Sequence, residues 1–321
     1  MNVFVTRKIP ESGLSMLKKH HSVTVSQKDR VLSKKEIIDH AKDAEGLVCL
    51  LTDTIDEEVI SHLPKLKMIA NYAVGFNNVD VEYATQENIP VSNTPGVLTD
   101  TTAELAWALV FSVSRRIVES DMFCRDDKFE GWGPMLMLGQ DISKKTLGIV
   151  GAGRIGTAMA LKSKGFAMNV LYVNPERNSV LESELNAKKT TLPELLSQSD
   201  IVSLHVPLTA ETEHLIGEKE LKLMKENAVL VNTSRGPVID EKPLIQALEE
   251  NWIFGAGLDV YEQEPMIPER LKQLDNVVIL PHIGSATKET RSKMAEMAAK
   301  NMITGLKGDQ PPNCVNPEVF K

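Results

Sequence analysis

Three segments of the sequence carry side chains that could bind an anionic substrate and exchange a proton with it. Arg235 lies in segment 232–236, Glu264 in segment 259–265 and His282 in segment 281–285. An arginine can make paired, charged hydrogen bonds to a carboxylate, and a histidine changes charge near neutral pH. Each segment follows an apolar run typical of a buried strand, and ligands of parallel α/β sheets bind beyond the carboxyl ends of the strands. Each segment alone has an ordinary structural explanation, but their shared position at one sheet edge favours a joint catalytic role.

A glycine-rich segment in the middle of the chain has the spacing of a dinucleotide-binding loop. Gly151, Gly153 and Gly156 follow the apolar run 147–150 and precede a helical pattern over residues 157–164. Gly151 allows the tight turn, and Gly153 lets the backbone approach a pyrophosphate. Gly156 lets helix and strand pack closely, and the helix N-terminus offers N–H groups to the phosphates. The order strand, glycine loop and helix therefore predicts a dinucleotide site.

The end of the second strand of this unit bears on which dinucleotide binds. An acidic residue there usually holds the adenosine ribose, whereas this strand ends in Asn174, which Glu176 and Arg177 follow. Asn174 would not repel a 2′-phosphate and Arg177 could pair with it, so the pattern favours NADP(H) over NAD(H). NAD(H) stays open because Glu176 could bind the ribose from a slightly shifted loop, and Arg177 could be an ordinary solvated charge.

Apolar runs alternate with helical patterns along the chain, which predicts an α/β protein with parallel sheets. In the N-terminal third we expect strands at residues 3–5, 46–51, 68–70 and 89–91, with helices at 11–19, 56–63 and 81–87. Six further strands, which would form a Rossmann-type doubly wound sheet, are expected at 147–150, 170–173, 201–206, 228–232, 255–260 and 277–280.

Two long helices and one irregular segment complete this outline. One helix is expected to start at a capping box formed by Thr101 and Glu104 and to continue to Ile117, and another to span 287–306. Residues 121–144 show no period and predict an extended arm or loop. We expect a dinucleotide-binding domain over 97–286 and a second, flavodoxin-like α/β domain from 1–96 with 287–321.

Composition excludes several classes of function. The 321 residues carry a net charge of −8, which argues against nucleic-acid binding. The longest apolar stretch, residues 105–113, is too short to cross a membrane, and the first residues lack the pattern of a signal peptide. Three widely separated cysteines show no metal or redox spacing. We therefore expect a cytoplasmic protein with no bound metal.

Taken together, the motifs resemble the signatures of the D-isomer-specific 2-hydroxyacid dehydrogenases in order and spacing. The likeness extends over the whole chain without a large insertion. Within that family the chain is most similar to glyoxylate/hydroxypyruvate reductases. That closer likeness rests on segments 50–53, 94–104, 131–134 and 282–287.

The resemblance implies a catalytic triad of Arg235, Glu264 and His282. Arg235 would bind the carboxylate and the ketone of a 2-oxo acid, and His282 would protonate the ketone oxygen as hydride arrives at carbon. Glu264 would bond the other imidazole nitrogen. The backbone of Val74 and Gly75 would bind the substrate carboxylate, with Leu51 facing the substrate's side chain. Beyond the three glycines, Asn174 and Arg177, the implied cofactor contacts are Thr102, Arg154, Ile155, Pro207, Thr233 and, at the nicotinamide carboxamide, Asp259.

The implied activity is reduction of a small 2-oxo acid, such as glyoxylate or hydroxypyruvate, to the D-2-hydroxy acid by hydride transfer from NAD(P)H. A 2-ketogluconate reductase or another D-2-hydroxyacid dehydrogenase is an alternative, with phosphoglycerate dehydrogenase less favoured. A more distant alternative is a nicotinamide-sensing binding protein like the corepressors of this family. The resemblance also implies a homodimer formed through residues 121–138, in which Trp132 either reaches the neighbouring active site or packs locally.

Overall fold

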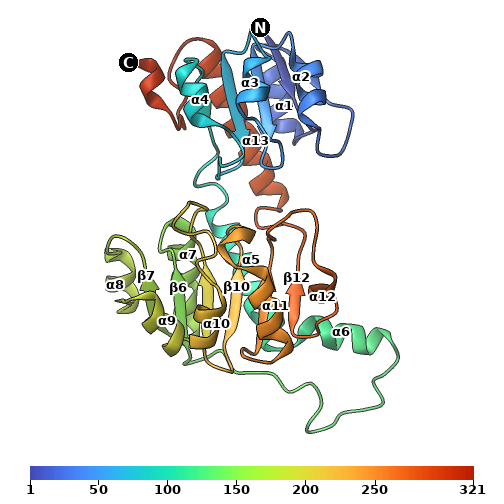
Figure 1. Ribbon diagram of the computed structural model, residues 1–321, viewed down its shortest axis with the longest axis vertical. Coiled ribbons are helices and arrows are strands. Elements are labelled where there is room, and N and C mark those ends of the chain that lie inside the picture. The colour runs from blue at the N-terminus through green and yellow to red at the C-terminus, as the bar shows by residue number, and fades with distance from the viewer. The chain divides into compact units, whose positions relative to one another are not determined.

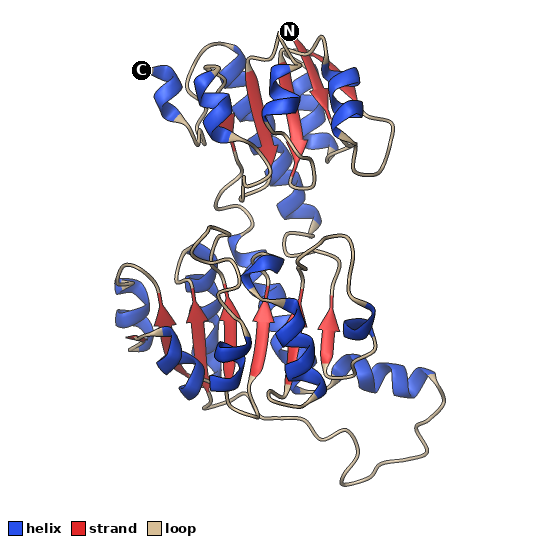
Figure 2. Cartoon of the chain, in the orientation of Figure 1, coloured by secondary structure: helices blue, strands red, loops and turns tan.

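The computed structural model describes residues 1–321, which divide into two compact units (Figure 1). The first unit comprises residues 1–98 and 285–321, and the second comprises residues 99–284. Each unit is built on its own sheet, in which every strand pair is parallel, with helices packed against the sheet (Figure 2). The expected α/β architecture is thus confirmed.

The first unit has a five-stranded sheet in the order β2-β1-β3-β4-β5. This is the strand order of flavodoxin-like folds, as expected for the domain that contains the N-terminal third of the chain. Its strands are β1 (Asn2–Val5), β2 (Ser22–Val25), β3 (Gly46–Leu50), β4 (Met68–Tyr72) and β5 (Val91–Ser92). Its helices are α1 (Glu11–Lys18), α2 (Lys34–Ala41), α3 (Glu57–Ser61), α4 (Val81–Gln86) and α13 (Lys288–Leu306).

The C-terminal helix α13 belongs to this first unit. Thr287 caps it by accepting a hydrogen bond from the Thr290 N–H at 3.2 Å. The helix packs closely against α1 at Gly13. A Cβ atom at this position of α1 would lie 2.5 Å from the carbonyl oxygen of Ala295 in α13. Two elements of this unit were not predicted. β2 lies at the sheet edge and buries no residue fully, and α2 is signalled only by the capping box of Ser33 and Glu36.

The second unit has a seven-stranded sheet in the order β12-β11-β10-β9-β6-β7-β8, which is the doubly wound order of a Rossmann-type fold. Its strands are β6 (Thr146–Val150), β7 (Asn169–Val173), β8 (Lys188–Lys189), β9 (Ile201–Leu204), β10 (Val229–Asn232), β11 (Gly255–Leu258) and β12 (Val277–Ile279). The six expected strands are present. The additional strand, β8, consists of two exposed lysines and leaves no apolar signal in the sequence.

Helices cover both faces of this sheet, and two apolar clusters form the core of the unit. The helices are α5 (Thr99–Ser114), α6 (Ile117–Arg125), α7 (Arg154–Lys162), α8 (Ser179–Leu185), α9 (Leu192–Gln198), α10 (Glu218–Leu223), α11 (Glu241–Glu249) and α12 (Glu269–Lys272). None of the helices in the structure is both long enough and apolar enough to span a bilayer.

Three expectations about helix boundaries are wrong. α5 starts at Thr99, so Thr101 lies inside the helix and does not cap it. The apolar stripe that extends to Ile117 belongs to two helices, because Arg116 adopts a left-handed conformation (φ 51°) and separates α5 from α6. α7 starts at Arg154, three residues before the predicted helical pattern. The irregular segment expected at residues 121–144 is shorter at its start, because α6 extends to Arg125; residues 126–145 are irregular.

Candidate functional site

The three segments with candidate catalytic residues meet at one edge of the second unit's sheet. Arg235 follows β10, Glu264 follows β11 and His282 follows β12, and these strands are neighbours in the sheet. All of them are parallel, so their carboxyl ends point to the same edge. The fold therefore brings together the polar segments that the sequence places after separate strands.

His282 and Glu264 form a directly bonded pair. The imidazole Nδ1 lies 2.8 Å from the carboxylate Oε2, and the other carboxylate oxygen accepts the Tyr261 N–H at 3.2 Å. The Tyr261 hydroxyl donates to the carbonyl oxygen of Leu280 at 2.7 Å, which ties the loop carrying Glu264 to the loop carrying His282. With Nδ1 engaged, Nε2 is the nitrogen through which His282 can act on a ligand.

Asp259 fixes the segment that carries His282. Its carboxylate, 1% exposed, accepts the N–H groups of Ile283 and Gly284, each at 2.7 Å. The Thr102 hydroxyl donates to the carbonyl oxygen of Gly284 at 3.1 Å. Burial raises the pKa of Asp259, and the two backbone donors oppose that rise. His282 itself is held in a left-handed backbone conformation (φ 54°). The sequence suggested Asp259 only as a cofactor contact, so this positioning role was missed.

Arg235 is a half-buried cation beside this pair. Burial lowers the pKa of its guanidinium, and the negative charge of Glu264 opposes that shift, so the two side chains interact electrostatically. Nη1 donates to the Ser234 carbonyl oxygen at 2.7 Å, and the Asn232 amide donates to the Arg235 carbonyl oxygen at 2.9 Å. A Cβ atom at the next residue, Gly236, would lie 1.8 Å from backbone atoms of Tyr261, so only glycine fits there.

The glycine loop has the geometry that a pyrophosphate requires. Gly151 has φ +95°, and a Cβ atom there would lie 2.7 Å from the His205 backbone. A Cβ atom at Gly156 would lie 2.1 Å from the Gly151 carbonyl oxygen, whereas one at Gly153 would meet nothing within 4 Å. No side-chain hydrogen bond caps α7 at Gly153, so an anion could bind the N–H groups of its first turn.

Other features also fit a dinucleotide at this edge. The Thr233 hydroxyl is buried and has no hydrogen-bond partner in the protein, so a ligand atom could satisfy it. Arg154 and Ile155 open α7, and Pro207 lies beyond the end of β9. Thr102 is buried in the first turn of α5. A cofactor bound here would be held by these residues together with the glycine loop.

The loop after β7 differs from the expectation that Arg177 is available to pair with a 2′-phosphate. The Asn174 amide donates to the carbonyl oxygen of Glu176 at 3.1 Å. Arg177 is not an unpaired cation, because its guanidinium forms an ion pair with Glu182 of α8 at 2.9 Å. The sequence did not indicate this partner.

The candidate substrate residues of the first unit lie at two strand ends. Leu51 directly follows β3 and is half-buried, and Val74 and Gly75 form a turn just after β4. The carbonyl oxygens of Val74 and Gly75 accept hydrogen bonds from Asn93 (2.7 Å) and Asn71 (2.9 Å). No protein group accepts the N–H groups of these two residues. The turn is therefore held through its carbonyls, with its donors free for an anion.

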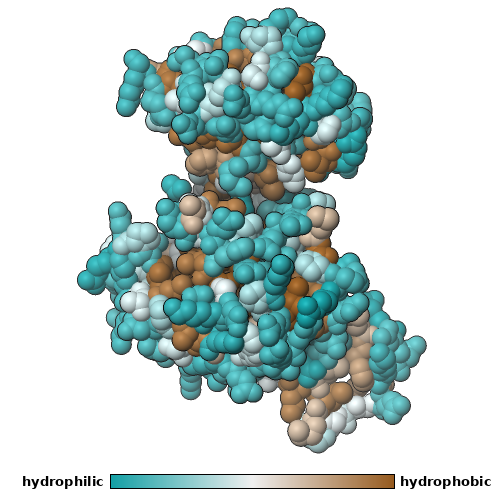
Figure 3. Space-filling model, in the orientation of Figure 1, coloured by the Kyte–Doolittle hydropathy of each residue, from teal (hydrophilic) through white to brown (hydrophobic).

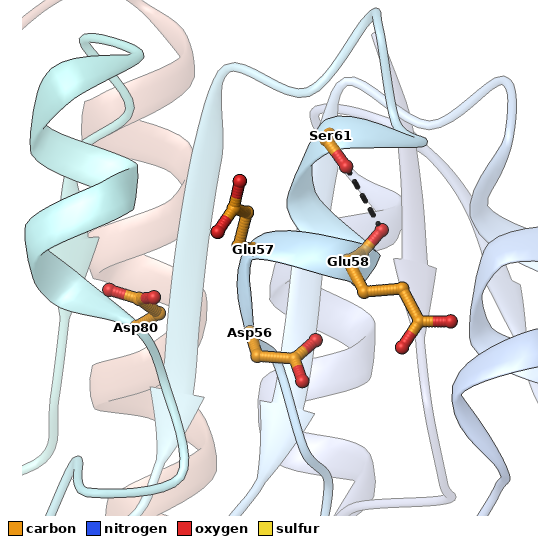
Figure 4. A pocket seen from close by; sticks show the side chains of 5 residues that line it. All are labelled: Asp56, Glu57, Glu58, Ser61 and Asp80. Carbon is orange, nitrogen blue, oxygen red and sulfur yellow. Dashed lines mark hydrogen bonds between the residues drawn. The ribbon is translucent and has the colours of Figure 1, made fainter.

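An acidic hollow in the first unit is not a comparable site. Figure 4 shows the five side chains that line it: Asp56, Glu57, Glu58, Ser61 and Asp80. Asp56 and Asp80 accept N–H groups at the starts of α3 and α4, and Lys34 forms ion pairs with Asp56 and Glu58. Three of the four carboxylates that line the hollow thus have structural partners. No cluster of three or more His, Cys, Asp or Glu side chains in the structure could hold a metal ion.

A second histidine–glutamate pair lies in the second unit and was also missed. His214 Nε2 contacts Glu262 Oε1, and the Glu262 N–H donates to Glu241 at 2.9 Å. The two residues are separated by 48 positions, so no local spacing reveals the pair. His214 carries a side chain that is 47% exposed, compared with 24% for His282.

Comparisons with known proteins find similar sequences and similar structures over nearly the whole chain. The family model of the D-isomer specific 2-hydroxyacid dehydrogenase NAD binding domain matches residues 107–284. A glyoxylate reductase of Korarchaeum cryptofilum is 54% identical over 321 residues, covering 99% of this chain and 97% of that protein. A solved Thermus thermophilus structure has a TM-score of 0.93 at 43% identity, covering 98% of this chain and 100% of that one.

A further solved structure contains a bound cofactor. It is an NADPH-dependent glyoxylate/hydroxypyruvate reductase from Sinorhizobium meliloti in complex with NADP and malonate, with a TM-score of 0.88 at 28% identity. The match covers 100% of this chain and 98% of that one. These matches confirm the resemblance that the motifs indicate. The chain belongs to the D-isomer-specific 2-hydroxyacid dehydrogenase family and is an oxidoreductase that uses a nicotinamide cofactor.

Proposed function

We propose that the chain reduces glyoxylate and hydroxypyruvate to the corresponding 2-hydroxy acids, with NADPH preferred and NADH accepted. The observation that carries this proposal is the His282–Glu264 pair at 2.8 Å, at the same sheet edge as Arg235. The names of the Korarchaeum and Sinorhizobium relatives support the substrate class. In this proposal the second unit binds the dinucleotide and the first unit contributes substrate contacts.

Each member of the triad has a distinct role in this reaction. Arg235 binds the substrate carboxylate and the ketone oxygen through its guanidinium, which keeps the reacting carbon in a fixed orientation. His282 donates the Nε2 proton to the oxygen of the reacting carbonyl as this group becomes an alcohol. Glu264 holds Nδ1, so the ring keeps one orientation and the positive charge of the proton-donating imidazolium is matched before the proton is transferred. When bound, the nicotinamide supplies the hydride that adds to the ketone carbon.

The remaining proposed contacts bind without taking part in proton transfer. The free N–H groups of Val74 and Gly75 bind the substrate carboxylate, and Leu51 contacts the substituent on the ketone. The glycine loop holds the pyrophosphate, and Thr233 offers its unpartnered hydroxyl to the cofactor. Asp259 supports the His282 segment with its backbone bonds and contacts the carboxamide of the nicotinamide with remaining lone pairs.

The proposed activity can be tested directly. Purified protein is mixed with NADPH or with NADH, and loss of the reduced nicotinamide absorbance is followed with glyoxylate, hydroxypyruvate, 2-ketogluconate or pyruvate. We expect the fastest loss with NADPH and the first two acids. Turnover of 2-ketogluconate alone would replace the proposed substrate class. No turnover of any acid, together with measurable NADH or NADPH binding, would support the nicotinamide-sensing alternative.

We also propose that the chain forms a homodimer through α6 and residues 126–145. This segment exposes many large apolar side chains, and in Figure 3 apolar atoms lie at the surface of the segment that Figure 1 places around α6. They are Ile117, Val118, Met122, Phe129, Trp132, Met135, Leu136 and Leu138. Trp132 is 85% exposed and so does not pack locally, which favours a contact with a second copy. A cytoplasmic location is part of this proposal, supported by three free thiols.

Light scattering should therefore give a mass of twice 35.5 kDa for the wild-type chain. A variant with Met122→Glu and Met135→Glu should run as a monomer, because two charges would enter an apolar interface. Val31→Glu is the matched control, since Val31 is exposed to 42% but lies outside this segment. A wild-type monomer, or a Val31 variant that dissociates equally, would contradict the proposed interface.

A further inference from the structure

The loop after β7 contains an ion pair that bears on cofactor choice. Arg177 donates from Nε to both oxygens of Glu182, at 3.1 and 3.2 Å, and from Nη2 to Oε2 at 2.9 Å. The Arg177 side chain is 78% exposed, while that of Glu182 is 23% exposed. The carboxylate is therefore the more buried partner, and the guanidinium is the more exposed one.

Glu182 is held in place by a buried tyrosine. The Tyr172 hydroxyl donates to Glu182 Oε1 at 2.5 Å and accepts the Asn178 N–H at 2.9 Å. The Asn178 amide in turn donates to the Ala152 carbonyl oxygen at 2.9 Å and to the Thr157 hydroxyl at 2.7 Å. This chain of hydrogen bonds connects the carboxylate to the glycine loop. The position of Glu182 relative to the proposed pyrophosphate site is thus set by the fold.

The two partners of Glu182 also keep it ionised. Hydrogen bonds from Arg177 and Tyr172 lower the pKa of this carboxyl group. The other charged groups of the loop are Glu176, which is exposed, and Lys189, whose Nζ donates to the carbonyl oxygen of Pro175 at 2.5 Å. Arg177 is consequently the cation of this loop that could form a fork with a phosphate, and Glu182 already occupies it.

We propose that Glu182 determines cofactor specificity, by competing with the 2′-phosphate of NADP(H) for the Arg177 guanidinium. This inference rests on the proposed function, because it assumes that the loop after β7 receives the adenosine ribose. A cofactor without the 2′-phosphate leaves the ion pair intact. One that carries it must draw Arg177 away from Glu182 and places its own negative charge near a fixed carboxylate. Glu182 therefore lowers the preference for NADP(H) that Asn174 and Arg177 would otherwise give.

The test compares two nucleotides that differ only at the 2′ position. Binding of 2′,5′-ADP and of 5′-AMP to the full chain is measured by calorimetry for the wild type, Glu182→Gln and Glu184→Gln. Glu184 is the matched control, because it lies on the same helix and its ion pair is with Lys164 at 3.3 Å. Glutamine keeps the shape and can still accept the tyrosine hydrogen bond, so the fold should be retained.

We expect Glu182→Gln to bind 2′,5′-ADP about 10-fold more tightly, a change of about 1.4 kcal/mol, with the 5′-AMP affinity unchanged. Glu184→Gln should alter neither affinity. Adding Arg177→Ala to the Glu182 variant should remove the gain, since the guanidinium is the group under competition. A gain below about twofold, or an equal gain for 5′-AMP, overturns the inference while the proposed function stands. If no variant binds either nucleotide and NADH does not bind, the proposed cofactor site fails, and this inference with it.

Discussion

Replacing His282 with alanine is expected to reduce kcat for glyoxylate reduction by about three orders of magnitude. A positioned general acid contributes about 10²- to 10⁴-fold, and His282 is the group in the site that can deliver a proton to the carbonyl oxygen of the substrate. NADPH affinity should stay within about twofold, because the glycine loop and the loop after β7 are unchanged by this substitution. Stopped-flow absorbance measures the chemical step, and fluorescence titration measures cofactor binding.

His214 supplies a matched control for this experiment. It also contacts a glutamate, Glu262, and lies in the same unit, but it is more exposed than His282 and takes no part in the proposed triad. His214→Ala should leave kcat within a few-fold of the wild type. If His282→Ala retained more than about a tenth of wild-type turnover, or if both variants lost activity equally, the assignment of His282 as the proton donor would be wrong.

The main outline of the candidate site could be predicted because it depends on local sequence and on a simple rule of sheet geometry. Arg235, Glu264 and His282 each follow a strand with a clear apolar signal, and parallel strands end at a common edge. The glycine loop was readable for the same reason, since Gly151 and Gly156 sit where a Cβ atom would collide with the backbone. Steric requirements of this kind allow only glycine, so they can be recognised in the sequence.

Pairings between distant side chains could not be predicted in this way. Arg177 was expected to be available for a phosphate, and its bond to Glu182 depends on how α8 leaves the loop after β7. The backbone bonds of Asp259 accompany a left-handed turn at His282, and a positive φ is uncommon for any residue with a side chain, so the sequence alone does not predict it. Strand β8 was missed for a related reason. It consists of two exposed lysines, which give no apolar pattern in the sequence.

Replacing Arg235 with alanine should lower kcat/KM for glyoxylate by about 10²- to 10⁴-fold. A hydrogen bond to a charged group is worth about 1.5–3 kcal/mol, and the substitution removes two of them from the bound substrate. Arg235→Lys should recover part of the loss, because the charge returns while the planar fork does not. Initial rates over a range of glyoxylate concentrations give kcat/KM, and NADPH titration should show an unchanged dissociation constant.

The surface residue Arg270 provides the control, since its side chain is 66% exposed and pairs with Glu249. Arg270→Ala should leave kcat/KM within about twofold, as is usual for an exposed ion pair. Added guanidinium ion should restore some activity to Arg235→Ala and none to His282→Ala, because it replaces a cation and not a proton donor. If Arg235→Ala kept the wild-type KM for glyoxylate and lost only kcat, Arg235 would act on the transition state alone. The ground-state carboxylate would then have to be held by other groups, of which the N–H donors of Val74 and Gly75 are the first to consider.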